Sequence, residues 1–422
     1  MTSEGGPIYI FVWLKGRGYV PAALLAEYAG GRRCTLGYGR NYAVLPDAIP
    51  IDPVSLPLYM PQVAVTPPGT SIFPALRDAA PDKWGRKLLG LLAGRPAGTL
   101  TEVEVLTAAH SRNRIGALAF GGSPDGPASM AAWATGEVFS LHEADLGRVA
   151  RVVAEVDRVD DDANLDALRR RLPEEVFLRA LASSLSVGGG RPKALVSVDG
   201  VECIAKFPKR GDVWNEPRVE HATMTLAARC GIAAARTRVE EVDGVGVLLV
   251  RRFDRDEDGE PVHFVSGFTL NRRISEDGDW GSYQDLAQVA RQHGDERAGH
   301  ELFRRMAFNV LCRNVDDHPR NHAFFVRRSG ISMTPVFDVV PAQVGFRQPE
   351  LALACGRMGR EASIENVLSM PEPFGLRRGE AEAMVADMRR EMQDWRAHFT
   401  ECGVSGPDIA LLEDRFALVS GR

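Results

Sequence analysis

Three polar residues in the second half of the chain have the types and spacing that phosphoryl transfer requires. Asp316 and Asn321 lie five positions apart in the segment Asn314-Val315-Asp316-Asp317-His318-Pro319-Arg320-Asn321, and Asp338 follows in Phe337-Asp338. Phosphoryl transfer needs one carboxylate to accept the proton of the attacking hydroxyl, and oxygen ligands for Mg²⁺. The spacing of acid, amide and second acid is that of protein-kinase catalytic centres. The sequence therefore predicts a kinase-type catalytic loop.

The same loop allows two other interpretations. A hydrolytic metal site is one of them, because aspartate and histidine are common metal ligands and four of them lie close together at Asp316, Asp317, His318 and His322. The two histidines have helical i, i+4 spacing, but Pro319 disfavours helical geometry at the residue before it, so the two rings need not share a face. A purely structural loop is the third interpretation.

A glycine-rich segment and a lysine further upstream could supply the nucleotide half of such a site. Gly188, Gly189 and Gly190 precede Arg191-Pro192-Lys193, and glycines let backbone amides approach phosphate oxygens closely. Lys206 lies near the end of a predicted strand, opposite its apolar side chains, and Glu220 could hold the ammonium by an ion pair. A flexible turn and an exposed strand lysine are the alternatives.

Turn and cap signals place these residues on defined elements. Asp199-Gly200 and Asp243-Gly244 each predict a tight hairpin, and Gly231 is the expected C-terminal cap of a helix over 216–230. The chain beyond residue 279 is predicted to be mainly helical, with an apolar stripe directly before the Asp316 loop. The expected segments in this part are the stripe at 302–311, a strand-like run at 330–333, and helices at 379–399 and 407–419.

Length and composition predict a globular protein of two or three domains. The chain has 422 residues, and its 51 Lys and Arg against 56 Asp and Glu give a net charge of -5. This balance argues against a nucleic-acid surface along the whole chain. Six widely spaced cysteines without a Cys-x-x-Cys pair predict reduced thiols, and the apolar run at 8–14 is too short to cross a membrane. A cytoplasmic location is expected.

The order of elements predicts an α+β fold with a two-lobed, protein-kinase-like arrangement. A small α+β N-terminal subdomain is expected over 1–125, with a helix at 81–92 and a Gly, Ser and Pro-rich loop at 121–127. An N-lobe carrying the glycine-rich loop is expected over 140–270, and a helical C-lobe carrying the Asp316 loop over 271–422. The acidic run at 157–162 is interpreted as a solvated turn that ends a helix within 141–172.

Taken together, the motifs resemble the HipA family of bacterial serine/threonine kinases, which are the toxins of toxin–antitoxin pairs. The resemblance covers nearly the whole chain, and its matching segments occur in the family's order. They are 71–76, 81–86 and 115–120 in the N-terminal part, and 188–193, 252–255, 314–321 and 337–338 in the remainder. The resemblance implies ATP and Mg²⁺ as cofactors.

The resemblance also implies a role for each site residue. Asp316 would be the general base, and Asn321 and Asp338 the Mg²⁺ ligands. Arg251 to Phe253 would form the inter-lobe hinge that meets the adenine, with Asp254 near the ribose. The remaining ATP contacts would come from Gly188, Gly189, Gly190, Arg191, Pro192, Lys193, Lys206, Glu220, His318 and Arg320. Two positions depart from the family pattern. Arg320 occupies the position before Asn321 where the family pattern has a lysine. Asp317 adds a second carboxylate that could raise the pKa of the base or bind metal.

Self-phosphorylation and partners are implied in the same way. Ser186 occupies the position of the family's autophosphorylation site, with Ser183 and Ser184 as nearby alternatives. A phosphoserine adds about 1.5 to 2 negative charges, so it should exclude ATP and inactivate the kinase. The implied partners are a helix-turn-helix antitoxin of the HipB type, DNA through that complex, and an aminoacyl-tRNA synthetase as substrate, with no membrane. The competing hypothesis is a non-catalytic pseudokinase that binds a partner.

Overall fold

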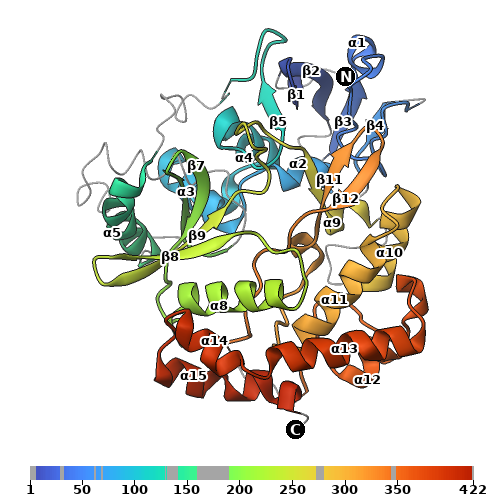
Figure 1. Cartoon of the computed structure of the whole chain (residues 1–422). Helices are drawn as coiled ribbons and strands as arrows, with labels where there is room; N and C mark the ends of the chain where they lie inside the picture. Colours follow the sequence, from blue (N-terminus) through green and yellow to red (C-terminus); the bar gives the residue numbers. More distant parts are fainter. Residues whose placement is uncertain are drawn as a thin grey trace.

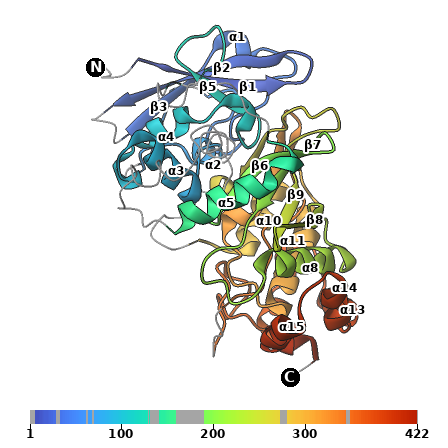
Figure 2. The same cartoon turned by 90° about the vertical axis from the view of Figure 1, so that its left-hand side faces the viewer.

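The structure is a computed structural model that describes residues 6–28, 33–60, 63–67, 70–128, 130, 141–158, 190–271, 280–343 and 348–420. The N-terminal region (residues 6–128) lies at the top of the molecule and the C-terminal helices lie at the bottom, with the strands of residues 193–251 between them (Figure 1). Figure 2 shows the same division from the side. The described part of the chain has no helix that is long and apolar enough to cross a membrane.

The N-terminal region is built on an antiparallel sheet of five strands in the order β4-β3-β2-β1-β5. The register between β1 and β2 shifts at Ile10/Phe11, where Pro21 faces Phe11. Proline cannot donate a hydrogen bond, so a bulge is where a strand accommodates it. The strands are β1 (Ile8–Leu14), β2 (Gly18–Tyr28), β3 (Arg33–Tyr38), β4 (Ala64–Val65) and β5 (Leu118–Gly121).

Short helices complete this region, and α3 matters most for the site. Asp82 caps its N-terminus by accepting a hydrogen bond from the Gly85 amide at 3.3 Å, and Gly94 ends it with a φ of 68°. The helix predicted at 81–92 is therefore confirmed. The helices are α1 (Arg40–Ala43), α2 (Pro74–Asp78), α3 (Lys83–Ala93) and α4 (Glu102–Ala108), with 3-10 turns η1 (Ala97–Thr99) and η2 (Ser111–Asn113).

A second antiparallel sheet has the strand order β6-β7-β9-β8 and is covered by helix α8 (Figure 1). Asp199 and Asp243 both have a φ of 51°, and each is followed by a glycine with positive φ, so both predicted hairpins are confirmed. Gly231 follows the end of α8 with a φ of 76°, as expected of its cap. The elements are α5 (Leu146–Asp157), β6 (Lys193–Val198), β7 (Val201–Lys206), α8 (Glu216–Arg229), β8 (Thr237–Val242) and β9 (Val245–Arg251).

The remainder is mainly helical, as predicted, but it contains a three-stranded sheet, β10-β11-β12. Its strands are β10 (Phe264–Ser266), β11 (Ala323–Arg327) and β12 (Gly330–Met333). The helices are α9 (Gly267–Leu270), α10 (Tyr283–Gln292), α11 (Ala298–Leu311), α12 (Ile364–Leu368), α13 (Arg378–Met392), α14 (Trp395–Glu401) and α15 (Gly406–Leu412). The 3-10 turns of this part are η5 (Pro319–Asn321), η6 (Glu372–Phe374) and η7 (Glu413–Ser420), whereas η4 (Glu143–Asp145) directly precedes α5.

Two helical predictions at the C-terminus need correction. The helix predicted over 379–399 is two helices, because the chain leaves helical geometry at Asp394 (ψ 21°). This break lets Trp395 stack on Phe416 with their ring centroids 4.3 Å apart. The helix predicted over 407–419 is α15 followed by the 3-10 turn η7. Packing of three aromatic rings, Trp395, Phe399 and Phe416, decides this geometry.

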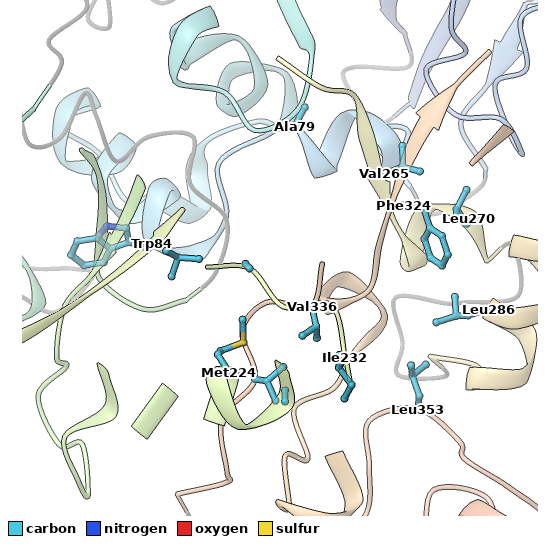
Figure 3. Close-up of a cluster of buried hydrophobic side chains, with 14 of the residues drawn as sticks. Ala79, Trp84, Met224, Ile232, Val265, Leu270, Leu286, Phe324, Val336 and Leu353 are labelled. Atoms are coloured by element: carbon cyan, nitrogen blue, oxygen red, sulfur yellow. The ribbon is translucent and has the colours of Figure 1, made fainter. Parts of the chain in front are cut away.

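Buried apolar side chains form one continuous core through the described parts of the molecule. Figure 3 shows a portion to which Ala79 and Trp84 of the N-terminal region contribute, together with Met224 of α8 and Phe324 of β11. Polar contacts add to this junction. Asp78 of α2 accepts hydrogen bonds from Ser266 and Thr269 at the start of α9. The N-terminal region is thus attached to the segments that carry the candidate site.

Candidate active site

The side chain of Lys206 lies between two carboxylates that come from distant parts of the chain. Its Nζ is 2.6 Å from Glu220 Oε1 on α8 and 2.5 Å from Asp338 Oδ1. Burial alone would lower the pKa of Lys206, but Asp338 and Glu220 outweigh it and raise that pKa. The lysine is therefore a fixed ammonium, and its predicted ion pair with Glu220 is confirmed.

Asp338 has an unusual backbone and an accessible carboxylate. Its φ is 59°, in the left-handed region that a residue other than glycine rarely adopts. The ammonium of Lys206 is the main cause that lowers the pKa of Asp338, so its carboxyl is ionised. Its side chain is 37% exposed, which leaves room for a further ligand.

Asn321 carries a second oxygen that could bind a metal. Its Nδ2 donates a hydrogen bond to the Asp316 carbonyl oxygen at 2.9 Å, which leaves the amide oxygen for another partner. A carboxylate and an amide oxygen suit Mg²⁺, which binds through few protein ligands and completes its shell with phosphate oxygens and waters. The described residues contain no group of three or more His, Cys, Asp or Glu that could hold a metal without such help. Asn321 and Asp338 therefore fit the Mg²⁺ of a nucleotide complex.

Asp316 lies on the exposed side of the loop. Partial burial is the main cause that raises its pKa, while His318 opposes the shift and Asp338 adds to it. A raised pKa makes the carboxylate a better proton acceptor. Asp316 is therefore accessible and suited to the role of general base.

Asp317 is turned into the protein, which corrects the expectation that it could bind metal. It accepts hydrogen bonds from Tyr283 Oη at 2.5 Å and from the Ala352 amide at 2.6 Å. Burial raises its pKa to about 7. His322 is also buried, and burial lowers its pKa to about 3. With Asp317 and His322 committed to the interior, the geometry gives no support to the hydrolytic metal site.

The part of the glycine-rich segment that the structure describes begins at Gly190; Ser183, Ser184, Ser186, Gly188 and Gly189 lie outside the described residues. Arg191 forms an ion pair with Asp212 and another with Glu216 at 3.5 Å. Pro192 is buried, and its carbonyl accepts a hydrogen bond from the Phe207 amide at 3.0 Å. Lys193, the first residue of β6, pairs in register with Lys206 on β7. The end of the segment thus brings a second lysine beside Lys206.

The N-terminal region also contributes to the site, through the start of α3. Asp82 Oδ2 lies 4.0 Å from Lys193 Nζ and accepts no hydrogen bond from a described residue. Trp84 Nε1 donates a hydrogen bond to the Lys193 carbonyl oxygen at 3.2 Å. Burial raises the pKa of Asp82 to about 6. Sequence reasoning missed this contribution, because the local pattern marks Asp82 only as a helix cap.

The predicted hinge residues follow β9. Arg251 is the last residue of that strand, and Phe253 packs against Phe337 with ring centroids 5.2 Å apart, beside Asp338. Asp254 instead lies in a buried cluster: it pairs with Arg252 at 2.7 and 2.9 Å and accepts a hydrogen bond from the Gly116 amide at 2.7 Å. Although burial opposes it, Arg252 lowers the pKa of Asp254 to about 2. Its carboxylate is occupied by the protein, so the structure gives Asp254 an architectural role, and its contact with a ribose stays a prediction.

His318 and Arg320, the other predicted ATP contacts, each pack against an aromatic ring. The His318 ring meets the Trp280 ring edge-on with centroids 5.5 Å apart, and the Arg320 guanidinium lies 4.1 Å from the centroid of the Phe268 ring. The structure thus brings together Lys193, Lys206, Glu220 and Asp338, and places Asp316, His318, Arg320 and Asn321 on one adjoining loop.

Comparison with known proteins identifies related sequences. The HipA-like C-terminal domain matches residues 185–396, which is half of the chain. This chain is 27% identical to the serine/threonine-protein kinase toxin HipA of Shewanella oneidensis, in an alignment that covers 40% of this chain. It is 28% identical to a candidate kinase of Haemophilus influenzae, in an alignment that covers 29% of this chain. The aligned segments span 46% and 40% of these relatives, which is less than half of each.

A solved structure extends the similarity of fold to nearly the whole chain. It is the Shewanella oneidensis toxin–antitoxin complex of HipA, HipB and operator DNA, with a TM-score of 0.67 at 18% identity, covering 98% of this chain and 95% of the other. The expected α+β, two-lobed, kinase-like fold is thereby confirmed. On the strength of the matching domain, this chain belongs to the HipA family of kinases.

Proposed function

We propose that the protein is an ATP- and Mg²⁺-dependent serine/threonine protein kinase. The single observation that carries this proposal is the position of Lys206 between Glu220 and Asp338, at 2.6 and 2.5 Å. A lysine held by a helix glutamate next to a metal-binding aspartate is how protein kinases fix the phosphates of ATP. Each of the three residues comes from a different element, so their meeting reflects the fold and not local sequence.

The residues divide the reaction between them. Asp316 accepts the proton of a serine or threonine hydroxyl while that oxygen forms a bond to the γ-phosphorus. The bond from the γ-phosphorus to the bridging oxygen breaks, and ADP leaves with the electron pair. Lys206 and Lys193 hold the phosphates and balance their charge. Mg²⁺, bound by Asn321 and Asp338, would supply further charge neutralisation.

Self-phosphorylation and toxicity extend this proposal. Ser186 precedes the phosphate-binding segment, where a phosphate group would repel ATP. We infer that its modification inactivates the kinase. A HipB-type antitoxin is the proposed partner and would bring DNA to the complex, in line with the Shewanella assembly of HipA, HipB and operator DNA. A translation component such as an aminoacyl-tRNA synthetase is the proposed substrate, whose phosphorylation would restrain growth and favour persistence.

The direct test is transfer of label from γ-labelled ATP with Mg²⁺. The wild-type protein should label itself or a protein in a cell lysate, whereas Asp316→Asn should not. Asp387→Asn is a matched control, because Asp387 is an exposed aspartate on α13 that pairs with Arg390 at the surface. Labelling that persists in Asp316→Asn would contradict the assignment of the base.

Nucleotide binding can be measured separately from turnover. An acyl-phosphate derivative of ATP transfers its acyl group to lysines beside the phosphates, and the chain has six lysines in total. Acylation should fall on Lys206 or Lys193, and an excess of ATP should prevent it. Specific acylation without phosphoryl transfer would favour the pseudokinase alternative, whereas no protection by ATP would contradict the proposed kinase.

A further inference from the structure

A cavity of about 680 Å³ lies between the N-terminal region and the catalytic loop. One wall comes from α2, α3 and the connection to α4. The opposite wall comes from Phe268, Trp280 and residues 318–320. Asp316 is two residues before His318 in the same loop. A molecule bound in this cavity would therefore lie beside the proposed general base.

The lining of the cavity is positively charged, although the net charge of the whole chain is -5. The described lining residues include five cationic side chains and two carboxylates, Asp82 and Glu102, so their net charge is +3. Glu102 is engaged by two of those cations, at 3.3 Å from Arg77 and 2.6 Å from Arg86. The five cations are Arg77, Lys83, Arg86, Lys87 and Arg320.

Lys83 and the aromatic wall indicate what kind of ligand fits. Lys83 is exposed at the first position of α3, where its ammonium can reach an incoming carboxylate. The Phe268 and Trp280 rings lie behind Arg320 and His318, so two side chains of this wall are backed by rigid groups. A basic cavity with an ordered wall suits an acidic ligand of limited size.

We propose that this cavity binds an acidic segment of a protein substrate and so presents the neighbouring hydroxyl to Asp316. The inference rests on the proposed kinase function and adds a substrate class to it. A nucleic acid is the less favoured ligand, because its backbone requires an extended basic surface, whereas these cations surround one cavity. Electrostatic complementarity would mainly select among substrates and speed their binding.

The test uses the full-length protein and three synthetic peptides of equal length. Each has one central serine, flanked by glutamates, alanines or lysines, and carries a fluorophore. Binding is measured by anisotropy with a non-hydrolysable ATP analogue and Mg²⁺ present. We expect the glutamate peptide to bind about tenfold more tightly than the alanine peptide, and the lysine peptide most weakly. An unlabelled 20-nucleotide RNA serves as competitor.

Lys83→Glu is the decisive variant. A glutamate in the first turn of a helix is favourable, so α3 should remain folded and acylation by the ATP derivative should be unchanged. The preference for the glutamate peptide should fall about tenfold. Arg40→Glu is the matched control, because Arg40 is an exposed cation of the same region on α1. It should leave the preference intact.

The outcomes separate this inference from the proposed function. Equal binding of the glutamate and alanine peptides, including binding of neither, would overturn the inference while acylation of Lys206 still supported nucleotide binding. An unchanged preference in Lys83→Glu, or displacement of the peptide by RNA at lower concentration than by unlabelled peptide, would also overturn it. If the ATP derivative acylates neither Lys206 nor Lys193, or if excess ATP does not prevent that acylation, the result would instead count against the proposed function.

Discussion

Lys193 stands directly opposite Lys206 across the β6–β7 ladder, so two ammonium groups meet at one end of this hairpin. Each has its own acidic neighbours: Asp82 near Lys193, and Glu220 with Asp338 at Lys206. Lysines are scarce in this chain, with six among its 51 basic residues. Two of the six therefore lie side by side, and in the proposed function both would contact the phosphates of ATP.

Replacing Lys206 should affect stability and activity together. Lys206→Met leaves the buried carboxylate of Glu220 without its cation, and we expect the free energy of unfolding to fall by about 3–5 kcal/mol. Phosphoryl transfer should be lost. Urea unfolding and labelling with γ-labelled ATP measure the two effects. Lys206→Met/Glu220→Gln should recover stability without activity; a double variant no more stable than the single one would contradict the ion-pair explanation.

Asp82→Asn should lower the pKa of Lys193 while preserving the fold. Asparagine caps helices as well as aspartate does, but it removes the negative charge 4.0 Å from the Lys193 ammonium. Burial already lowers the pKa of Lys193, and loss of the Asp82 carboxylate, which opposes that shift, should lower the pKa further. The pH dependence of Lys193 acylation, followed by mass spectrometry, reports this shift. Exposed Lys209 is the internal control, and equal profiles in both proteins would refute the coupling.

Asp317 should make stability depend on pH. Its pKa in the folded protein, about 7, is above the ordinary value of 3.8, so the folded state holds a proton that the unfolded state has lost. The contribution of Asp317 to stability is therefore complete below about pH 4 and decreases as the pH rises towards about 7.

Asp317→Asn isolates this effect, because an amide resembles the protonated acid. The difference in free energy of unfolding, wild type minus variant, should fall between about pH 4 and pH 7 and stay constant above about pH 8. Urea denaturation at several pH values measures it, and other titrating groups cancel in the difference. A difference that rises with pH would show that Asp317 is ionised in the folded protein.

Asp254 should act as a structural residue. Asp254→Asn removes the buried carboxylate partner of the Arg252 guanidinium, leaving only the half-exposed Glu202, and weakens the contact with Gly116. We expect a loss of about 3–5 kcal/mol in the free energy of unfolding. Arg252→Met/Asp254→Leu should lose less than the sum of the two single variants. Normal stability of Asp254→Asn, with weakened ATP binding, would restore a direct nucleotide role.

The sequence allowed prediction of those features that depend on neighbouring residues. Asp199-Gly200 and Asp243-Gly244 carry their turn geometry in two residues, and Gly231 marks the end of α8 in the same local way. The Lys206–Glu220 pair was also predictable, since strand and helix periodicity together fix the directions of both side chains. The Asp316 loop could be predicted to be catalytic because that prediction depends on residue types at short spacing; its catalytic role stays a prediction.

Features that depend on contacts between distant segments were not predictable. Asp82 and Trp84 meet Lys193 across more than 100 positions, and a helix-cap pattern does not indicate which group lies beyond the cap. The inward orientation of Asp317 is set by Tyr283 and the Ala352 amide, neither of which is near it in sequence. The break between α13 and α14 likewise depends on the stacking of Trp395 on Phe416.

The left-handed backbone of Asp338 has a mechanical consequence. Such a conformation costs roughly 1–3 kcal/mol in a residue with a side chain, and the short contact with Lys206 helps to offset that cost. If the ammonium shifts, the peptide units around Asp338 can relax towards extended geometry and carry the adjacent Phe337 ring, which packs on Phe253, with them. One ion pair thereby couples the backbone strain at Asp338, the proposed metal ligand, to the packing of Phe253 in the proposed hinge.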